Sequence, residues 1–170
     1  MKKKVLLFGI ITFVLVAVTI AALSSTKTDA NESKPTTTTT STSTPGRTVA
    51  YLNKDAKLEE ITQTEGAVNI YMFWGNGCPH CKNQWETLED LRKEYPNDFK
   101  VYGFEVWNSA ENKELLYTFA GAMGDEVNAV PYTIIGDKSF TGTMKEKVII
   151  EMIKEYKDKK VDIYFDKIKK

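Results

Sequence analysis

The sequence predicts an α/β domain over residues 50–170, with a central mixed β-sheet flanked by helices. Apolar, strand-like runs alternate there with amphipathic, helix-like runs, which is typical of α/β folds. Right-handed crossovers make strands that are separated by a helix parallel to each other. Near the end of the domain, Gly136 and Asp137 separate two short strand-like runs, which indicates a hairpin and therefore an antiparallel strand at the edge.

The expected elements follow one another without an internal repeat. The run over 67–74 is apolar on nearly both faces, as a central strand covered by helices should be. The first helix should turn Leu58 and Ile61 toward the core, and Ser109 can cap a later helix. Residues 161–168 either extend the last helix or pack as a second piece. In chain order we expect helix 53–64, strand 67–74, helix 79–95, strand 99–107, a helix after Ser109, strand 129–135, strand 138–141 and helix 144–156.

Apolar residues recur at three-to-four spacing along the helices and should face the core. Trp74 and Trp107 are expected to be packing residues as well. The helical residues expected in the core are Trp85, Leu88, Leu91 and Tyr95, then Leu115, Leu116, Phe119, Ala120 and Met123, and finally Val148, Ile149, Met152 and Ile153.

The only two cysteines of the chain, Cys78 and Cys81, lie where the first strand gives way to a helix. A cysteine at the start of a helix lies beside unpaired backbone N–H groups and the positive end of the helix dipole, and both stabilise a thiolate. Pro79 suits the first helical position, where a missing N–H costs nothing. His80, the only histidine, could add a hydrogen bond or a positive charge to the Cys78 thiolate. The pattern predicts a redox-active dithiol.

Two other interpretations of the cysteines are weaker. A zinc site would need two more soft or imidazole ligands, and the only histidine lies between the two cysteines. A structural disulfide would close a loop so short that it removes little entropy from the unfolded chain. A lone histidine is otherwise an inert surface residue. We therefore expect catalytic Cys78, Cys81 and His80, with no metal and no other cofactor.

The stretch Trp74-Gly-Asn-Gly-Cys-Pro-His-Cys81, with a strand before it and a helix after it, resembles the active-site turn of the thioredoxin superfamily. Its Pro-His pair resembles the DsbA-type thiol oxidases. About 120 residues from Ala50 onward fit that fold. The inserted helical domain of the DsbA type is missing, because Trp107 and Val130 leave room for only one helix between them. The resemblance implies a thioredoxin-like fold and a thiol–disulfide oxidoreductase.

The resemblance also implies roles for individual residues. Cys78 would be the exposed sulfur that exchanges with substrate, and Cys81 its shielded partner. Pro131 resembles the family's cis-proline, so Val130 would offer its backbone N–H and C=O to an extended substrate. Trp74 could shape the surface beside Cys78. The expected substrate-binding residues are Val130, Pro131, Pro79 and Trp74.

One position departs from the family pattern. Many members carry a buried Asp or Glu six residues before the first cysteine, where it can accept a proton from the second cysteine. Met72 occupies that position here. Water or another group must then take this proton. Glu105 from the neighbouring strand is one candidate, and an edge-facing, solvated Glu105 is the alternative.

The N-terminal segment, residues 1–23, predicts a membrane anchor or a signal. Lysines 2–4 precede nineteen uncharged residues, 5–23. At 1.5 Å per residue these span about 28 Å, close to the hydrocarbon thickness of a bilayer. The lysines should stay in the cytoplasm, so the rest of the chain lies outside. Ala22 to Ser24 is an acceptable cleavage site, so a signal peptide is the alternative. Residues 24–49 form a Thr- and Ser-rich linker, expected to be disordered.

Together these observations predict an exported thiol–disulfide oxidase that forms disulfides in secreted proteins with free thiols. An extracytoplasmic thiol reductase is one alternative, and a non-catalytic accessory or chaperone protein for an exported peptide such as a bacteriocin is another. We expect a monomer held at the cell membrane by a single span, or a secreted protein if the segment is cleaved, with a membrane redox partner. With 23 basic and 23 acidic residues, nothing points to nucleic acid.

Overall fold

The computed structural model describes residues 51–170. The N-terminal segment 1–23 and the linker 24–49 lie outside this range, so their assignment stays a prediction. Among residues 51–170, no helix is both long enough and apolar enough to span a bilayer.

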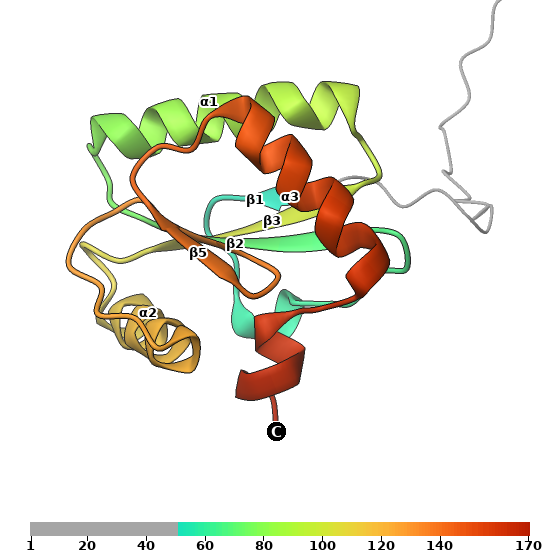
Figure 1. Ribbon diagram of the computed structural model, residues 1–170. Helices are drawn as coiled ribbons and strands as arrows, with labels where there is room; N and C mark the ends of the chain where they lie inside the picture. The colour runs from blue at the N-terminus through green and yellow to red at the C-terminus, as the bar shows by residue number, and fades with distance from the viewer. Residues whose placement is uncertain (1–50) are drawn as a thin grey trace, which may run out of the picture. The chain divides into compact units, whose positions relative to one another are not determined.

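The centre of the fold is a five-stranded mixed sheet with the strand order β1-β3-β2-β4-β5 (Figure 1). β1 and β2 each pair with β3 in parallel, whereas β4 is antiparallel to both β2 and β5. The expected mixed sheet with an antiparallel hairpin edge is thus confirmed. The strands are β1 (Leu52–Asn53), β2 (Val68–Trp74), β3 (Phe99–Glu105), β4 (Tyr132–Ile135) and β5 (Lys138–Thr141).

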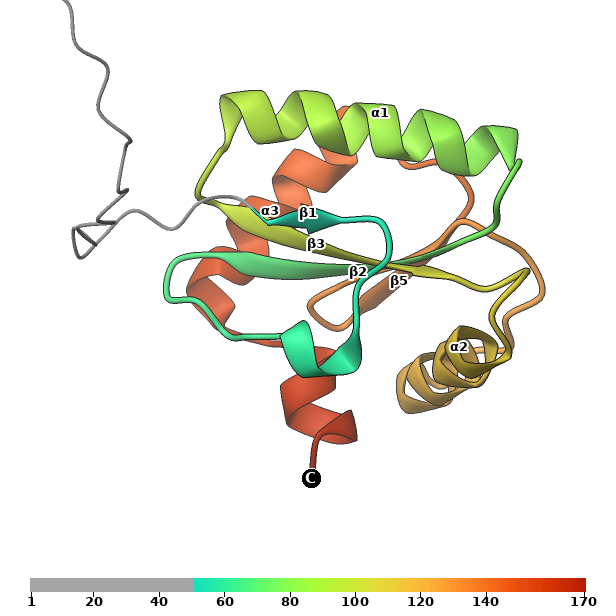
Figure 2. The same ribbon diagram turned by 180° about the vertical axis from the view of Figure 1, so that it is seen from behind.

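Helices cover both faces of the sheet. Figure 2 shows α1 above the sheet and α2 below it. The core divides accordingly: one apolar cluster joins α1 and α3 to the sheet, and the other joins α2 and the C-terminal η2 to the opposite face. The helices are α1 (Pro79–Glu94), α2 (Ala110–Met123) and α3 (Glu146–Lys159), with the short pieces η1 (Leu58–Glu60) and η2 (Tyr164–Ile168).

β2 is the strand that both core clusters share. Successive side chains of a strand point to opposite faces. Ile70 and Met72 therefore enter the cluster under α1, and Tyr71 and Phe73 enter the cluster over α2. All four are completely buried. The prediction of a central strand that is apolar on both faces is confirmed, and the thirteen helical core residues listed above all lie in one cluster or against it.

The expected first helix, 53–64, is wrong. Residues 52–64 instead contain β1 and the single turn η1. The backbone N–H of Val101 donates to Tyr51 O over 2.7 Å, so this segment closes the edge of β3. Ile61 is buried as expected, but Leu58 is 36% exposed. Strand pairing therefore outweighs the helical spacing of the apolar residues.

The C-terminal residues form a separate piece rather than an extension of α3. α3 ends at Lys159, and its C-cap residue, Lys160, has a left-handed φ of 53°. Asp162 then enters the core, where its carboxylate accepts from Asn69 Nδ2 at 2.8 Å and from the Tyr71 hydroxyl at 2.7 Å. Burial raises the pKa of Asp162. These bonds fasten η2 to the lower face of β2.

Candidate active site

Cys78 and Cys81 form a disulfide at the start of α1, with their Cα atoms 5.2 Å apart. Cys78 is the N-cap residue, and the backbone N–H of Cys81 donates to its sulfur over 3.1 Å. Pro79 fills the first helical position, as expected. The sulfur of Cys78 therefore lies where free N–H groups and the helix dipole favour a negative charge.

The two cysteines differ in accessibility. Cys78 exposes 6% of its surface and Cys81 exposes 1%. Cys78 is thus the more accessible sulfur, although it is less exposed than the sequence led us to expect. Both residues belong to the apolar cluster beneath α1, which covers most of their surface.

The segment before β4 passes directly beside Cys78. The peptide bond between Val130 and Pro131 is cis. The carbonyl oxygen of Val130 lies 3.9 Å from Cys78 Sγ. Of the expected substrate-binding residues, Val130 thus lies next to the disulfide, and Pro79 and Trp74 line a cavity on its other side.

This cavity, of about 560 Å³, opens between α1 and the turn that precedes Cys78. Both cysteines reach it. Trp74 and Trp85 form its apolar wall, with their rings edge to face at 6.2 Å. The indole N–H of Trp74 donates to Lys54 O over 2.8 Å, which fixes its ring. Trp74 therefore packs and also shapes the surface beside Cys78.

Glu105, at the end of β3, holds together the two loops that flank the disulfide. Its carboxylate accepts the backbone N–H of Asn76 at 3.0 Å, and those of Trp107 and Asn108 at 3.0 and 2.9 Å. Partial desolvation raises the pKa of the carboxyl, but the N–H groups of Asn76, Asn108 and Trp107 outweigh it, so the pKa is below its usual value. A carboxylate held in this way is a weak base, which argues against Glu105 as the proton acceptor for Cys81.

The other two residues singled out from the sequence differ in burial. His80 is exposed on the first turn of α1. Met72 is completely buried in the cluster that contains both cysteines. Its cross-strand neighbour on β4 is Thr133. Thr133 Oγ1 is buried and has no hydrogen-bond partner within residues 51–170, so it brings a hydroxyl to the face that lacks a carboxylate.

Trp107 is not the packing residue that the sequence predicted. Its side chain is 59% exposed. The ring lies flat against Gly75, where any Cβ atom would overlap it. Tyr117 of α2 is 48% exposed and lines a groove together with Trp107. Neither position gives a sequence signal for exposure, because aromatic residues are ordinarily counted as core.

In the part of the chain from 51 to 170, no group of three or more His, Cys, Asp or Glu residues could hold a metal ion. The two cysteines are joined to each other. The disulfide itself can support thiol–disulfide exchange.

Glu105→Gln tests how strongly the carboxylate stabilises the two loops. We expect the variant to lose about 1–2 kcal/mol of unfolding free energy at pH 7, since a charged acceptor becomes a neutral amide and water screens part of the effect. The folded-state pKa of Glu105 is lowered, so this stability is complete above the unfolded value of about 4.3 and disappears as the pH falls through the folded value. Urea unfolding at several pH values measures it.

The matched control is Glu114→Gln, an exposed carboxylate on α2. This variant should unfold like the wild type at every pH. A Glu105→Gln deficit that stayed constant down to pH 2.5 would contradict the role of the carboxylate charge.

Comparison with known proteins identifies the family. No family model matches the chain. A thioredoxin of Methanocaldococcus jannaschii is 32% identical over 89 residues, which cover 52% of this chain and 94% of that protein.

Two solved structures are similar as well. One is an uncharacterized thioredoxin-like protein from Clostridium perfringens, 25% identical, covering 63% of this chain and 81% of that one with a TM-score of 0.49. The other is a glutaredoxin from Archaeoglobus fulgidus, 31% identical, covering 52% of this chain and 88% of that one with a TM-score of 0.36. The match to nearly the whole M. jannaschii thioredoxin, together with the disulfide at the start of α1, shows that this chain belongs to the thioredoxin family.

Proposed function

We propose that this chain is an exported thiol–disulfide oxidase, which forms disulfides in secreted proteins through Cys78 and Cys81. The observation that carries the proposal is the position of the Cys78 sulfur at the helix N-cap, 3.1 Å from the N–H of Cys81. A thiolate at that position is stabilised, and stabilising the reduced form makes a disulfide more oxidising. The resemblance of Pro79-His80 to the DsbA-type dipeptide supports the same direction.

The reaction consists of two thiol–disulfide exchanges. A substrate thiolate attacks Cys78 Sγ, and the bond to Cys81 breaks. The electron pair leaves with Cys81, whose sulfur takes up a proton. A second substrate thiol loses its proton and attacks the substrate sulfur of the mixed disulfide, and Cys78 leaves as a thiolate. Two electrons have then passed from the substrate to the cysteine pair, and the substrate holds a disulfide.

Three residues would assist these steps. An extended substrate would pair with the backbone of Val130, whose carbonyl oxygen lies 3.9 Å from Cys78 Sγ. Such pairing needs no particular side chain on the substrate, which suits an oxidase of many proteins. His80, exposed two residues after Cys78, would stabilise the thiolate that leaves. The hydroxyl of Thr133 would help to move the proton of Cys81 where Met72 replaces the family's carboxylate.

A thiol reductase is the second candidate. It is favoured by the 32% identity to a protein named thioredoxin. The two functions use the same cysteines and the same mixed disulfide, but electrons flow in opposite directions. The reduction potential of the cysteine pair therefore decides between them.

Cys81→Ala tests the redox function and the assignment of the two sulfurs. Its free Cys78 thiolate should attack disulfides of natural substrates and form mixed disulfides that persist, because no second cysteine displaces the substrate. Non-reducing gels should show these adducts. Cys78→Ala is the matched control and should show few or none.

Adducts that depend on Cys81 instead would reverse the assignment. If neither variant forms adducts and both keep the biological activity, a non-catalytic accessory role takes the place of the redox role.

The location of the domain is a further part of the proposal. Residues 5–23 would anchor the chain, and a membrane redox partner would reoxidise the cysteines. The full-length chain should then stay with membranes during carbonate extraction, and protease added to wall-stripped cells should release a fragment beginning near residue 50. A soluble form that begins near Ser25 would show that the segment is a cleaved signal. Retention of an intact, protease-resistant domain inside the cells would refute export.

A further inference from the structure

Two polar side chains share the buried face of α1 with Cys81. They are Gln84 and Trp85, three and four residues after the cysteine. Residues at these spacings are neighbours on a helix, with Cβ atoms about 5–6 Å apart. Long helical side chains also lean back toward the N-terminus of their helix, which here is the turn that holds Cys81. Gln84 and Trp85 are therefore the next residues along this face from the buried sulfur.

Both side chains carry an N–H group that lacks a hydrogen-bond partner. Within residues 51–170, the buried side-chain N and O atoms without a partner are Gln84 Nε2, Trp85 Nε1, Thr133 Oγ1 and Asn69 Oδ1. The first three can donate a hydrogen, whereas the last can only accept one. An unpaired buried donor costs folding free energy, so its presence in a native structure needs a reason. Two of the three unpaired donors belong to the same face of α1.

Contacts hold both side chains in place. The amide oxygen of Gln84 accepts the backbone N–H of Met144 over 2.6 Å, which fixes the end of the amide that carries the NH₂ group. The ring of Trp85 rests on Gly103, where an added Cβ atom would lie 2.5 Å from it. The two side chains are thus fixed by groups other than their N–H donors, and the donors stay available.

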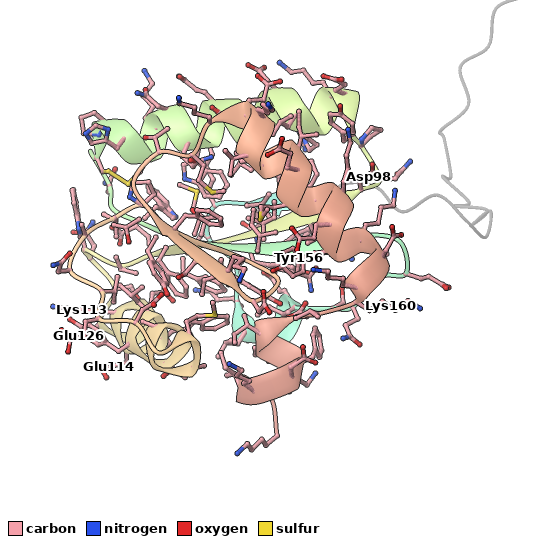
Figure 3. The ribbon with its side chains drawn as sticks, in the orientation of Figure 1. Asp98, Lys113, Glu114, Glu126, Tyr156 and Lys160 are labelled. Carbon is pink, nitrogen blue, oxygen red and sulfur yellow. A yellow bond between two sulfur atoms is a disulfide. The ribbon has the colours of Figure 1, made fainter. Side chains whose placement is uncertain are left out.

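Cys81 needs such donors when the disulfide opens. Its residue is only 1% exposed, so water cannot solvate a charge on its sulfur. Its backbone N–H donates to Cys78 instead. Figure 3 shows side chains filling the layer between α1 and the sheet, and those that cluster with the cysteines there are apolar. Apolar surroundings disfavour a thiolate.

Charged side chains offer Cys81 little help. The cavity that Cys81 and Trp85 both line has four charged residues, which form two exposed ion pairs. Opposite charges within a pair largely cancel, and water screens what remains. The pairs are Lys54 with Glu89 at 2.8 Å and Lys82 with Glu86 at 3.7 Å.

We propose that the N–H groups of Gln84 and Trp85 donate hydrogen bonds to the Cys81 thiolate. As a substrate thiolate bonds to Cys78 Sγ, the disulfide bond breaks and its electron pair stays on Cys81 Sγ. A disulfide sulfur is a weak acceptor and a thiolate a strong one, so the two hydrogen bonds form at this step. They lower the pKa of the leaving thiol, and such a thiol leaves faster. This inference rests on the exchange reaction of the function proposed above.

The first test measures how fast Cys81 leaves. Dithiothreitol reduces the oxidised full-length chain in detergent, and its second thiol closes a ring rapidly, so the first attack determines the rate. Gln84→Met and Trp85→Phe each remove one donor and keep an apolar side chain. Each should react about threefold more slowly than the wild type at pH 7. Two controls should react like the wild type: Gln63→Met, at an exposed glutamine, and Leu88→Val, which loosens the same core cluster without removing a donor.

The second test separates donors from residues that only pack. In Cys78→Ser, which keeps an oxygen at the N-cap, the Cβ resonance of Cys81 follows its ionisation by NMR. The pKa of Cys81 should be higher when Gln84→Met or Trp85→Phe is added, because the thiolate then loses a hydrogen bond. It should not change when Leu88→Val is added.

A third readout leaves both donors in place. In Cys78→Ser, the indole N–H resonance of Trp85 and the side-chain amide resonances of Gln84 should move as Cys81 titrates. The indole N–H of Trp74 is the internal control, because it already donates to Lys54 O over 2.8 Å, and it should move much less.

The outcomes separate this inference from the oxidase function. Slower reduction with an unchanged Cys81 pKa would show an effect of packing only and would overturn the inference. Trp85 and Gln84 resonances that do not respond to the titration would overturn it too. A reduction potential typical of a reductant would refute the oxidase alone, since Cys81 acts as a thiolate in both directions of exchange.

Discussion

The hydrogen bond from the backbone N–H of Cys81 to the sulfur of Cys78 requires a strand to end and a helix to begin within a few residues. β2 meets this requirement because both of its faces are buried, so its end is fixed by the whole core. α1 meets it because Leu88 and Leu91 anchor the helix to the sheet. The remaining elements hold this one junction in place, and the helix terminus supplies the field that favours a thiolate.

Around the junction of β2 and α1, contacts between loops position the residues that surround the disulfide. Glu105 binds the turn before Cys78 to the loop after β3, and Trp107 in that loop lies on Gly75. On the other flank, Val130 brings a backbone carbonyl beside the sulfur. Both cysteines line the cavity walled by Trp74 and Trp85, whereas Val130, beside Cys78, lines a groove walled by Trp107 and Tyr117. The same few loop contacts would determine both the reactivity of Cys78 and the access of substrates to it.

Sequence patterns predicted those parts whose causes are local. The buried run of β2, the helical spacing of α1 and the cysteine pair at its start can each be identified from neighbouring residues. β1 could not be predicted, because residues 52 and 53 form a strand rather than a helix only by pairing with the edge of β3. Glu105 and Trp107 were misjudged for a similar reason: their partners are backbone N–H groups and a glycine of other segments. The separate piece η2 depends on Asp162, whose partner Tyr71 is 91 residues away.

The reduction potential of the Cys78–Cys81 pair tests the central claim most directly. Equilibration with glutathione buffers of known ratio, followed by trapping of free thiols, measures it. In the proposed mechanism a helix-start thiolate, assisted by His80, would stabilise the reduced form, so the account predicts a potential above about −200 mV, toward the value of about −120 mV for a strong oxidant of this superfamily. A potential near about −270 mV, as in thioredoxin, would contradict the oxidase and establish a reductant.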